Sequence, residues 1–397
     1  MPFQFYLRKL LLCKLRKMFL MRNVVDLFAG CGGLSEGFKA AGFNVLASVE
    51  WEPICIETID ANSPDDHVSF LTDVREYKNY LTGRDSLSSI AKDKSVDGVI
   101  GGPPCQAYSL AGRIRCPDGM KDDYRNYLFE AYIEVLKKIK PKYFVFENVM
   151  GMLSAKPGGV AVTDRLKDAF MTAGYVVPEI DKRIVFDLAD MGGPQKRRRV
   201  LIFGVRKASF KEPKIIVENF YEALRAKKTS PGTVAGAIGD LPALMPLKAP
   251  TGRESHKAVK GDLLHKPRFH NERDIRIFRR LAKDAQLKNP KLQSIDELKR
   301  IYTEETGKTS SVHKYFVLKS NEPSNLIPAH LYKDGLRHIH YDPKQARSIT
   351  MREAARLQTF PDSFKFKGSQ GDIYKMIGNA VPPLLAEKVA EAISEIL

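Results

Sequence analysis

The sequence predicts an α/β protein with a doubly wound sheet and a smaller, irregular second domain. Short apolar runs typical of buried strands recur in the first half of the chain, and segments with helical apolar spacing lie between them. After Val205 the pattern changes to frequent proline and glycine, with seven of the eight histidines. Strands that alternate with helices form a parallel sheet, which binds its ligands at the carboxyl ends of the strands.

The expected elements follow from these runs in chain order. Strands are predicted at residues 24–28, 44–49, 96–100, 143–146 and 200–205, and helices at 34–41 and 127–139. In the second domain, residues 271–285 have helical spacing. Thr350 and Glu353 form a capping box for a helix that reaches about residue 359, and residues 382–396 form an amphipathic helix.

A length of 397 residues favours more than one domain. We expect a peripheral extension at 1–20, a first domain at 21–205, a second domain at 206–346, and a return to the first domain at 347–397.

Composition narrows the class of protein. Hydrophobic and charged contents of 43% and 28% are those of a globular chain that buries a core. No segment has the roughly 20 consecutive apolar residues of a membrane-spanning helix, and the N-terminal apolar run is shorter than the roughly 7 to 15 of a signal peptide. The five cysteines form no Cys-x-x-Cys pair, so we expect no disulfide framework and no metal site. A reducing, cytoplasmic location fits best.

The net charge of +17 is concentrated in two segments. Residues 206–346 hold 28 Lys and Arg against 16 Asp and Glu, residues 1–20 hold five basic and no acidic residues, and the rest of the chain is balanced. A neutral body with one basic segment is typical of a catalytic domain joined to a module that binds a polyanion. The alternative is a solvated basic surface.

A glycine loop follows the first predicted strand, in Asp26-Leu-Phe-Ala-Gly30-Cys-Gly32-Gly33. Glycines let the backbone approach a ligand closely, and Glu50, which ends the second strand, can hold ribose hydroxyls. The pattern predicts a nucleoside-cofactor site. By itself it does not separate NAD from S-adenosylmethionine, although Ser35 stands where the third glycine of the NAD fingerprint would be. A tight turn without a ligand is the alternative.

Cys105 follows a rigid Gly101-Gly-Pro-Pro turn after the strand at 96–100, which delivers it to the same edge of the sheet. Thiols attack as thiolates, so an attacking cysteine needs help from its surroundings or from protonation of its target. A lone cysteine is commonly inert core, but the rigid turn favours a nucleophile here.

Glu147 stands at the end of the strand at 143–146, at the same edge and in an apolar neighbourhood. A buried carboxyl group is a plausible proton donor near neutrality. A helix or turn cap is the alternative.

The run Gln195-Lys-Arg197-Arg-Arg199 leads into the apolar strand at 200–205. If the strand begins within this run, period-two alternation places Arg197 and Arg199 on one face, where two guanidiniums converge on one target. A solvated basic run or a localisation signal is the alternative.

Together these motifs resemble the DNA (cytosine-5) methyltransferase family over about residues 22–205 and 345–396. The resemblance consists of Asp26-Leu-Phe-Ala-Gly-Cys-Gly-Gly, Pro-Pro-Cys105-Gln, Glu147-Asn-Val, Gln195-x-Arg197-x-Arg199, Arg352-Glu-Ala-Ala-Arg-Leu-Gln and Gly378-Asn-Ala-Val-Pro-Pro, in family order. It implies the Rossmann-like fold of S-adenosylmethionine-dependent methyltransferases. The basic interval 206–346 occupies the place of the family's target-recognition domain.

The resemblance implies a covalent mechanism. Cys105 would add to C6 of a cytosine flipped out of duplex DNA, Glu147 would hydrogen-bond or protonate N3, and C5 would then accept the methyl group. Arg199, with Arg197, would hold the O2 side of the base. The residues implied to bind S-adenosylmethionine are Phe28, Gly30, Gly32, Gly33, Glu50, Trp51, Asp73, Asn379 and Val381.

Other functions remain as alternatives: a transfer-RNA cytosine-5 methyltransferase, and a catalytically silent nucleic-acid binder. The Cys-Phe-Thr tripeptide of the transfer-RNA branch is absent, because Gln-Ala-Tyr follows Cys105. A silent binder would be expected to have lost Cys105, Glu147 or an arginine. We expect a monomer that acts on double-stranded DNA, with a restriction endonuclease of the same site as a partner that forms no stable complex. The recognition sequence cannot be read from the chain.

Overall fold

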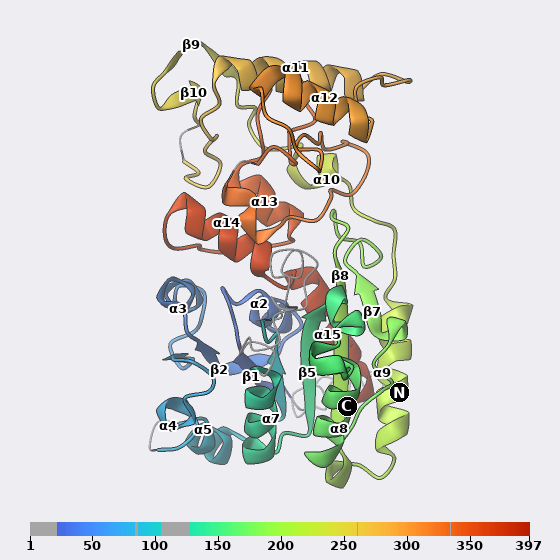
Figure 1. Ribbon diagram of the computed structural model, residues 1–397. Coiled ribbons are helices and arrows are strands. Elements are labelled where there is room, and N and C mark those ends of the chain that lie inside the picture. Colours follow the sequence, from blue (N-terminus) through green and yellow to red (C-terminus); the bar gives the residue numbers. More distant parts are fainter. Residues whose placement is uncertain (1–21, 84–85, 105–127, 260, 334) are drawn as a thin grey trace, which may run out of the picture. The chain divides into compact units, whose positions relative to one another are not determined.

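The computed structural model describes residues 22–83, 86–104, 128–259, 261–333 and 335–397 (Figure 1). The predicted nucleophile Cys105 and the extension 1–20 lie outside the described residues. By their contacts the residues form two compact units. Unit 1 consists of Met1–Phe186, Arg198–Lys227 and Leu385–Leu397, and unit 2 of Asp187–Arg197 and Lys228–Leu384.

Unit 1 is built on a mixed, mostly parallel sheet of eight described strands in the order β3-β2-β1-β4-β5-β8-β6, with β7 paired to β8. Figure 1 shows β2, β1, β5 and β8 in this order across the view. The strands are β1 (Asn23–Leu27), β2 (Asn44–Glu50), β3 (Val68–Leu71), β4 (Gly98–Gly101), β5 (Tyr143–Val149), β6 (Tyr175–Val176), β7 (Val185–Asp187) and β8 (Arg198–Arg206).

The predicted α/β class is confirmed, because every strand expected from an apolar run is present within a few residues of its expected bounds. Val25, Val99 and Val145 on adjacent central strands are fully buried, as expected for strands covered on both faces. The helices of the sheet are α2 (Gly33–Ala40), α3 (Pro53–Asp60), α4 (Tyr77–Tyr80), α5 (Leu87–Lys94), α7 (Leu128–Ile139), α8 (Val162–Thr172), α9 (Pro213–Ala226) and α15 (Pro383–Ile396).

The direction of β8 differs from the parallel sheet that the sequence predicted. β8 runs antiparallel to β5, so that Val205 lies opposite Tyr143 and Arg199 lies opposite Val149. An apolar run has the same composition in either direction, which is why strand direction cannot be read from it. The antiparallel pairing brings the first residues of β8 to the edge where the parallel strands end.

Unit 2 contains the hairpin of β9 (Pro246–Thr251) and β10 (Glu254–His256), several helices and long irregular connections. Helix α11 (Glu272–Ala285) begins at Asn271, whose side chain accepts a hydrogen bond from the Asp274 amide. Its buried Phe278 and Leu281 share an apolar core with Ile301 of the helix α12 (Ile295–Thr306). The other elements are α10 (Val234–Ile238), α12 (Ile295–Thr306), the 3-10 helix η6 (Ala329–Tyr332), α13 (Met351–Leu357) and α14 (Gln370–Asn379).

Contacts divide the chain at other points than the predicted boundaries 205/206 and 346/347. Residues 206–227 belong to unit 1, because α9 packs on β8 and the ring of Phe220 stacks on Phe203 at 4.1 Å. Residues 347–384 belong to unit 2, and only the last helix returns to unit 1. The assignment of target recognition to 206–346 remains a prediction about function.

Among the described helices, none is both long and apolar enough to cross a membrane.

Candidate active site

Strands β1 and β4 of unit 1 end in register with each other, beside residue Phe146 of the neighbouring parallel strand β5. Leu27 of β1 pairs with Gly101 of β4, and Gly101 pairs with Phe146 of β5. The residues that follow, Phe28, Gly102 and Glu147, therefore lie at one edge of the sheet. The structure thus brings together the glycine loop, the start of the Gly-Pro-Pro turn and the predicted acid.

The glycine loop after β1 has a strained, open backbone. Phe28 and Gly30 both have φ of 56°, in the left-handed region that favours glycine. A Cβ atom on Gly30 would have no atom within 4 Å, so this part of the loop faces open space. Strained backbone concentrates at functional sites, and an open glycine allows a ligand to approach the main chain closely.

Glu50, at the end of β2, holds this loop. Its Oε2 accepts a hydrogen bond from the Gly30 amide at 2.8 Å, and its Oε1 accepts the amides of Trp51 and Glu52 at 2.9 and 3.0 Å. Burial raises the pKa of the Glu50 carboxyl, although these amides oppose the shift. Since a carboxylate oxygen has two lone pairs, Oε2 retains capacity for one further donor. The ribose contact expected of Glu50 stays a prediction.

Two other predicted cofactor residues follow neighbouring strands. Trp51 is 60% exposed, an unusual position for a large apolar side chain, and its ring is available for stacking. Asp73 accepts hydrogen bonds from the Arg75 amide, Nε and Nη2, the last at 2.7 Å, and the hydrogen bonds from Arg75 lower the pKa of Asp73. The expected contact of Asp73 with adenine remains a prediction.

A buried ion pair joins the predicted acid to an arginine. Nε of Arg199 lies 2.6 Å from Oε1 of Glu147, and the two side chains are 9% and 10% exposed. Arg199 reaches Glu147 because they are diagonal neighbours on β8 and β5, where long side chains meet. The prediction that Glu147 lies in an apolar neighbourhood is therefore wrong, because its carboxyl group faces the guanidinium of Arg199.

The start of the predicted nucleophile loop packs beside the same carboxyl group. Asn148 Nδ2 donates to the Pro103 carbonyl at 3.3 Å, and a Cβ atom on Gly102 would lie 2.7 Å from Oε2 of Glu147. The sequence interpretation included Gly102 and Asn148 as members of motifs but assigned neither residue a role of its own. The signal was present in the second glycine of Gly-Gly-Pro-Pro, a position where the turn needs φ freedom or a neighbour needs room.

Arg197 does not share a strand face with Arg199, because β8 begins at Arg198. Arg197 is 1% exposed, and its guanidinium donates to the carbonyls of Ile327, Gly378 and Ala380 at 3.1, 2.9 and 2.9 Å. The predicted convergence of two guanidiniums on one target is thus wrong, and Arg197 is a structural residue of unit 2.

Arg197 instead fixes the segment that carries two predicted cofactor residues. Asn379 and Val381 alternate with Gly378 and Ala380, whose carbonyls Arg197 binds. Asn379 is exposed and Val381 is half-buried. Gln358, which the sequence interpretation missed, supports the same segment through hydrogen bonds from Nε2 to the carbonyls of Ile377 and Ala380.

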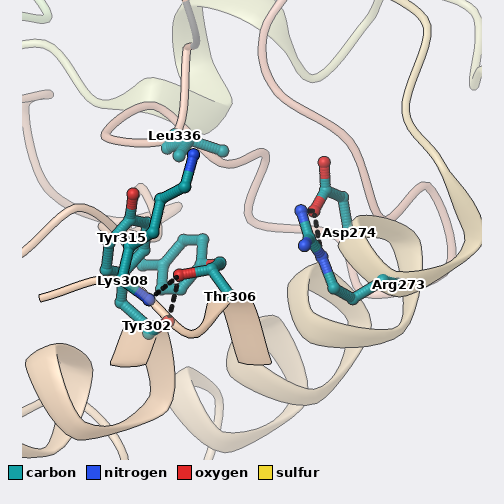
Figure 2. A pocket seen from close by; sticks show the side chains of 7 residues that line it. All are labelled: Arg273, Asp274, Tyr302, Thr306, Lys308, Tyr315 and Leu336. Atoms are coloured by element: carbon teal, nitrogen blue, oxygen red, sulfur yellow. Dashed lines mark hydrogen bonds and ion pairs between the residues drawn. The ribbon is translucent and has the colours of Figure 1, made fainter. Parts of the chain in front are cut away.

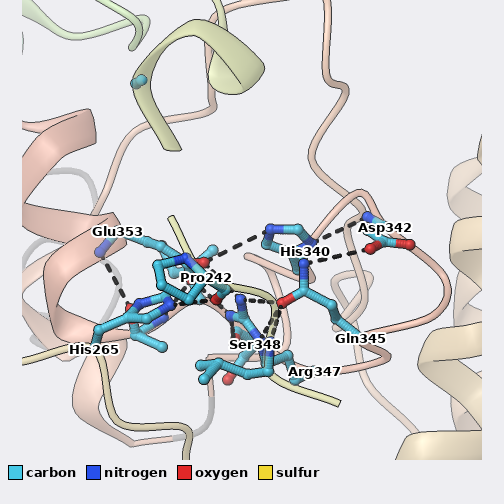
Figure 3. A network of polar contacts seen from close by, with 12 residues as sticks. Pro242, His265, His340, Asp342, Gln345, Arg347, Ser348 and Glu353 are labelled. Carbon is cyan, nitrogen blue, oxygen red and sulfur yellow. Dashed lines mark hydrogen bonds and ion pairs between the residues drawn. The ribbon is translucent and has the colours of Figure 1, made fainter. Parts of the chain in front are cut away.

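A buried polar network orders the segment before α13 (Figure 3). Arg347 binds both oxygens of Glu353 at 2.6 and 2.7 Å, and His340 Nε2 lies 3.6 Å from the same carboxylate. Burial alone would raise the pKa of Glu353, but Arg347 outweighs it and lowers the value to about 2. Thr350 and Glu353 form the predicted capping box, which confirms that helix start.

A small pocket of about 180 Å³ lies in unit 2 (Figure 2). Pockets for small molecules and cofactors measure roughly 300 to 1,000 Å³, so this pocket is too small for the predicted cofactor. None of its lining residues belongs to the predicted site: Arg273, Asp274, Tyr302, Thr306, Lys308, Tyr315 and Leu336.

The fold of unit 1, and the site residues at the carboxyl ends of its parallel strands, are those of a doubly wound α/β protein. Proteins of this class bind their ligands beyond these strand ends. Comparison with known proteins gives the family. A model described as C-5 cytosine-specific DNA methylase matches residues 22–395, and the chain belongs to that family.

Curated relatives are similar in sequence over nearly the whole chain, and they support the same family. The type II methyltransferase M.Bpa9945I of Bacillus paralicheniformis is 32% identical, with 94% of this chain and 99% of the relative covered. M1.HphI of Haemophilus parahaemolyticus, also a type II methyltransferase, is 34% identical over 93% of this chain and 86% of the relative. The protein is thus a DNA cytosine-5 methyltransferase of the restriction-modification type, as the sequence predicted.

Solved structures share the fold. A prophage-encoded protein of E. coli assigned as a DNA modification methyltransferase superimposes with a TM-score of 0.62 at 28% identity, covering 94% of this chain and 99% of the other. The Dnmt2 methyltransferase of S. pombe, at 16% identity and a TM-score of 0.50 over 94% of this chain and 98% of the other, shows likeness of fold alone.

Proposed function

We propose that the chain transfers a methyl group from S-adenosylmethionine to C5 of a cytosine flipped out of duplex DNA, through a covalent bond between Cys105 and C6. The observation that carries this proposal is the buried Glu147–Arg199 pair beside Gly102, where the Gly-Pro-Pro-Cys turn begins. We expect Cys105, which belongs to the turn that begins at Gly102, and the carboxyl group of Glu147 to act on two atoms of one pyrimidine ring.

The residues present fit the proposed cofactor. The open space at Gly30 leaves room beside the main chain, Glu50 retains a lone pair for a hydroxyl, and the exposed ring of Trp51 offers a stacking surface. We assign the cofactor to these residues with Phe28, Gly32, Gly33 and Asp73, and to Asn379 and Val381. S-adenosylmethionine, when bound, supplies an electrophilic methyl group.

The chain's own residues supply the rest of the chemistry. The Cys105 thiolate adds to C6 of cytosine, and the electron pair of the C5–C6 double bond moves through the ring toward N3. Glu147, protonated for this step, stabilises that charge by donating a hydrogen bond or its proton to N3. Arg199, whose Nε holds the carboxyl group and whose Nη1 donates to the Arg198 carbonyl, would offer its remaining donors to O2. C5 takes the methyl group, then loses its proton to a base, and the Cys105–C6 bond breaks to regenerate the thiolate. A C5 carbon is a poor nucleophile without this activation.

Recognition of double-stranded DNA is assigned to residues 206–346, whose excess of positive charge suits phosphate contacts. We further propose that the protein acts as a cytoplasmic monomer, and that a restriction endonuclease of the same site acts without forming a stable complex with it. Exchange of residues 206–345 for the equivalent region of a relative should change the methylated sequence and leave the chemistry intact. A chimera that kept the original site would place recognition elsewhere.

The decisive variant is Cys105→Ser, measured with tritiated S-adenosylmethionine and duplex DNA whose target is first mapped by bisulfite sequencing. The variant should bind cofactor and DNA like the parent protein but incorporate no methyl group. Appreciable incorporation by the variant would exclude the covalent mechanism. Methylation of transfer RNA in place of DNA by the parent protein would exclude the proposed substrate.

A further inference from the structure

After its first turn, the exposed residues of helix α11 in unit 2 are all basic. They are Arg276, Arg279, Arg280 and Lys283. At 3.6 residues per turn these positions fall within one sector of about 100° around the helix axis, and the apolar residues that the helix buries lie on the opposite side. The helix therefore presents one continuous row of cations to solvent.

Three of these cations form no ion pair with any residue that the structure describes. Nη2 of Arg276 lies 2.6 Å from Oε2 of Glu305 on α12, so this charge is paired. Arg279, Arg280 and Lys283 have no such partner among the described residues. We refer to these three residues as the basic ridge.

The spacing within the basic ridge opposes helix stability. Arg279 and Lys283 are four residues apart, where like charges repel each other. The neighbouring helix α12 (Figure 1) has opposite charges at such spacings, because Arg300 pairs with Glu297 and with Glu304. The helix dipole favours Lys283 in the last turn of α11, but the arginines lie before it. A cost in stability that a neighbouring helix avoids is typical of a surface that serves binding.

The loop after α11 does not neutralise this charge. Residues 275–295 include six basic residues and a single acidic one, Asp284. Asp284 is buried, and its oxygens accept the amides of Lys291 and Leu292, both at 2.9 Å. The surface is therefore positive along the helix and the loop, which suits a polyanion.

The basic ridge stands on a fixed support. Phe278 and Leu281, on the other side of α11, are fully buried in the apolar core of unit 2. The helix rises about 6 Å between Arg279 and Lys283, close to two steps of one DNA strand at roughly 3.4 Å each. Helix α11 contains no Asn, Gln, Ser or Thr, side chains that are common among those that read base edges. Its exposed face thus suits phosphates better than bases.

We propose that the basic ridge binds backbone phosphates of duplex DNA and reads no base. This inference rests on the proposed function, because it takes duplex DNA as the substrate. Phosphate contacts position a protein on the duplex and carry no sequence information. The basic ridge therefore sets the strength of DNA binding and its dependence on salt, while other residues select the methylated sequence.

The test combines Arg279→Gln, Arg280→Gln and Lys283→Gln in the full chain, because glutamine keeps a similar helix propensity. DNA affinity is measured between about 50 and 200 mM salt. Each phosphate contact contributes about 0.9 to the slope of log affinity against log salt, so the slope should fall by about 2.7. At about 100 mM salt, affinity should fall by about tenfold or more, equally for duplexes with and without the methylated sequence.

Two matched variants show whether charge at this place is what matters. Lys138→Gln with Lys140→Gln and Lys182→Gln removes the same charge from exposed positions of unit 1 that form no ion pair with a described residue, and it should keep the parent slope. Arg279→Lys with Arg280→Lys keeps the charge of the basic ridge and should also keep the slope. The triple glutamine variant should unfold at the same temperature as the parent protein or at a higher one, because it removes repulsion between like charges.

An unchanged salt slope in the triple glutamine variant would overturn the proposal, and so would an equal loss of slope in the unit 1 control. A loss of affinity that the charge-conserving variant shares would show a structural role instead. A loss confined to the duplex with the methylated sequence would show that the basic ridge reads bases. Absence of methyl transfer to DNA by the parent protein would refute the proposed function, whereas transfer by the parent with an unchanged slope in the variant would refute the role of the basic ridge alone.

Discussion

A Cβ atom on Gly102 would lie 2.7 Å from Oε2 of Glu147, closer than any ordinary contact of such an atom. Glycine at this position therefore allows the acid to occupy its place beside Arg199. The close approach of Gly102 and Glu147 links two parts of the proposed site. One is the turn that leads to Cys105, and the other is the carboxyl group that we expect to act on the same cytosine as Cys105.

Gly102→Ala should displace the Glu147 carboxyl group and reduce kcat by at least tenfold, with a smaller effect on cofactor affinity. Radiometric methyl transfer and cofactor titration measure the two effects. Gly252→Ala is the matched control, because a Cβ atom there meets nothing within 4 Å. Full activity of Gly102→Ala would mean that the carboxyl group has room to move without consequence.

Glu147→Gln should both destabilise unit 1 and abolish most methyl transfer. Loss of one charge leaves Arg199 buried without its partner, which costs about 3–5 kcal/mol, and loss of a positioned acid costs about 10²–10⁴ in rate. The double variant Glu147→Gln with Arg199→Gln should recover part of the stability and none of the activity. Urea unfolding and methyl transfer on all variants check this; recovered activity in the double variant would contradict a chemical role for Glu147.

Unit 2 should lose stability as the pH falls from about 6.5 to 4. Burial lowers the pKa of His256 and His340 to about 4 and of His270 and His338 to about 3. Below pH 6.5 the unfolded chain binds protons that the folded unit does not, so each histidine contributes up to about 1.4 kcal/mol per pH unit. The opening free energy from hydrogen exchange, corrected for the intrinsic exchange rate at each pH, should fall in peptides that cover α11 and α13 as the pH falls. An opening free energy there that does not change with pH would contradict the prediction.

Unit 1 should show the opposite trend because of Asp26, a residue behind the glycine loop that the sequence interpretation used only as a motif position. Burial raises the pKa of Asp26 to about 7, and its Oδ2 accepts a hydrogen bond from Ser35 Oγ at 2.6 Å. The folded state keeps this proton when the unfolded chain has lost it, so stability falls as pH rises from about 4 to 7, by on the order of 4 kcal/mol.

Asp26→Asn, which carries no charge at any pH, tests this assignment. The variant should match the parent protein near pH 3.5, where Asp26 is protonated in both the folded and the unfolded chain, and exceed its stability at pH 8, measured by hydrogen exchange in peptides that cover β1 and α2. Equal stability of the variant and the parent protein at pH 8 would show that folding does not raise the pKa of Asp26.

The local elements, and the edge of the sheet at which chemistry is expected, could be predicted from the order of residues alone. Apolar runs predict buried strands, so the strands expected at residues 24–28 and 143–146 lie within a few positions of β1 and β5. The cap of α13 was equally readable, because Thr350 and Glu353 interact within one turn. These signals depend only on residues that are close in the sequence, so they can be recognised without knowledge of the fold.

The different partners of the two arginines became clear only from the folded chain. Arg197 and Arg199 are two positions apart and share a motif, yet one binds carbonyls of unit 2 and the other binds Glu147. The difference depends on where β8 begins and on its antiparallel direction, which brings Arg199 beside the end of β5. Strand direction is set by long-range pairing and burial. It therefore cannot be predicted from the order of apolar and basic residues along one strand.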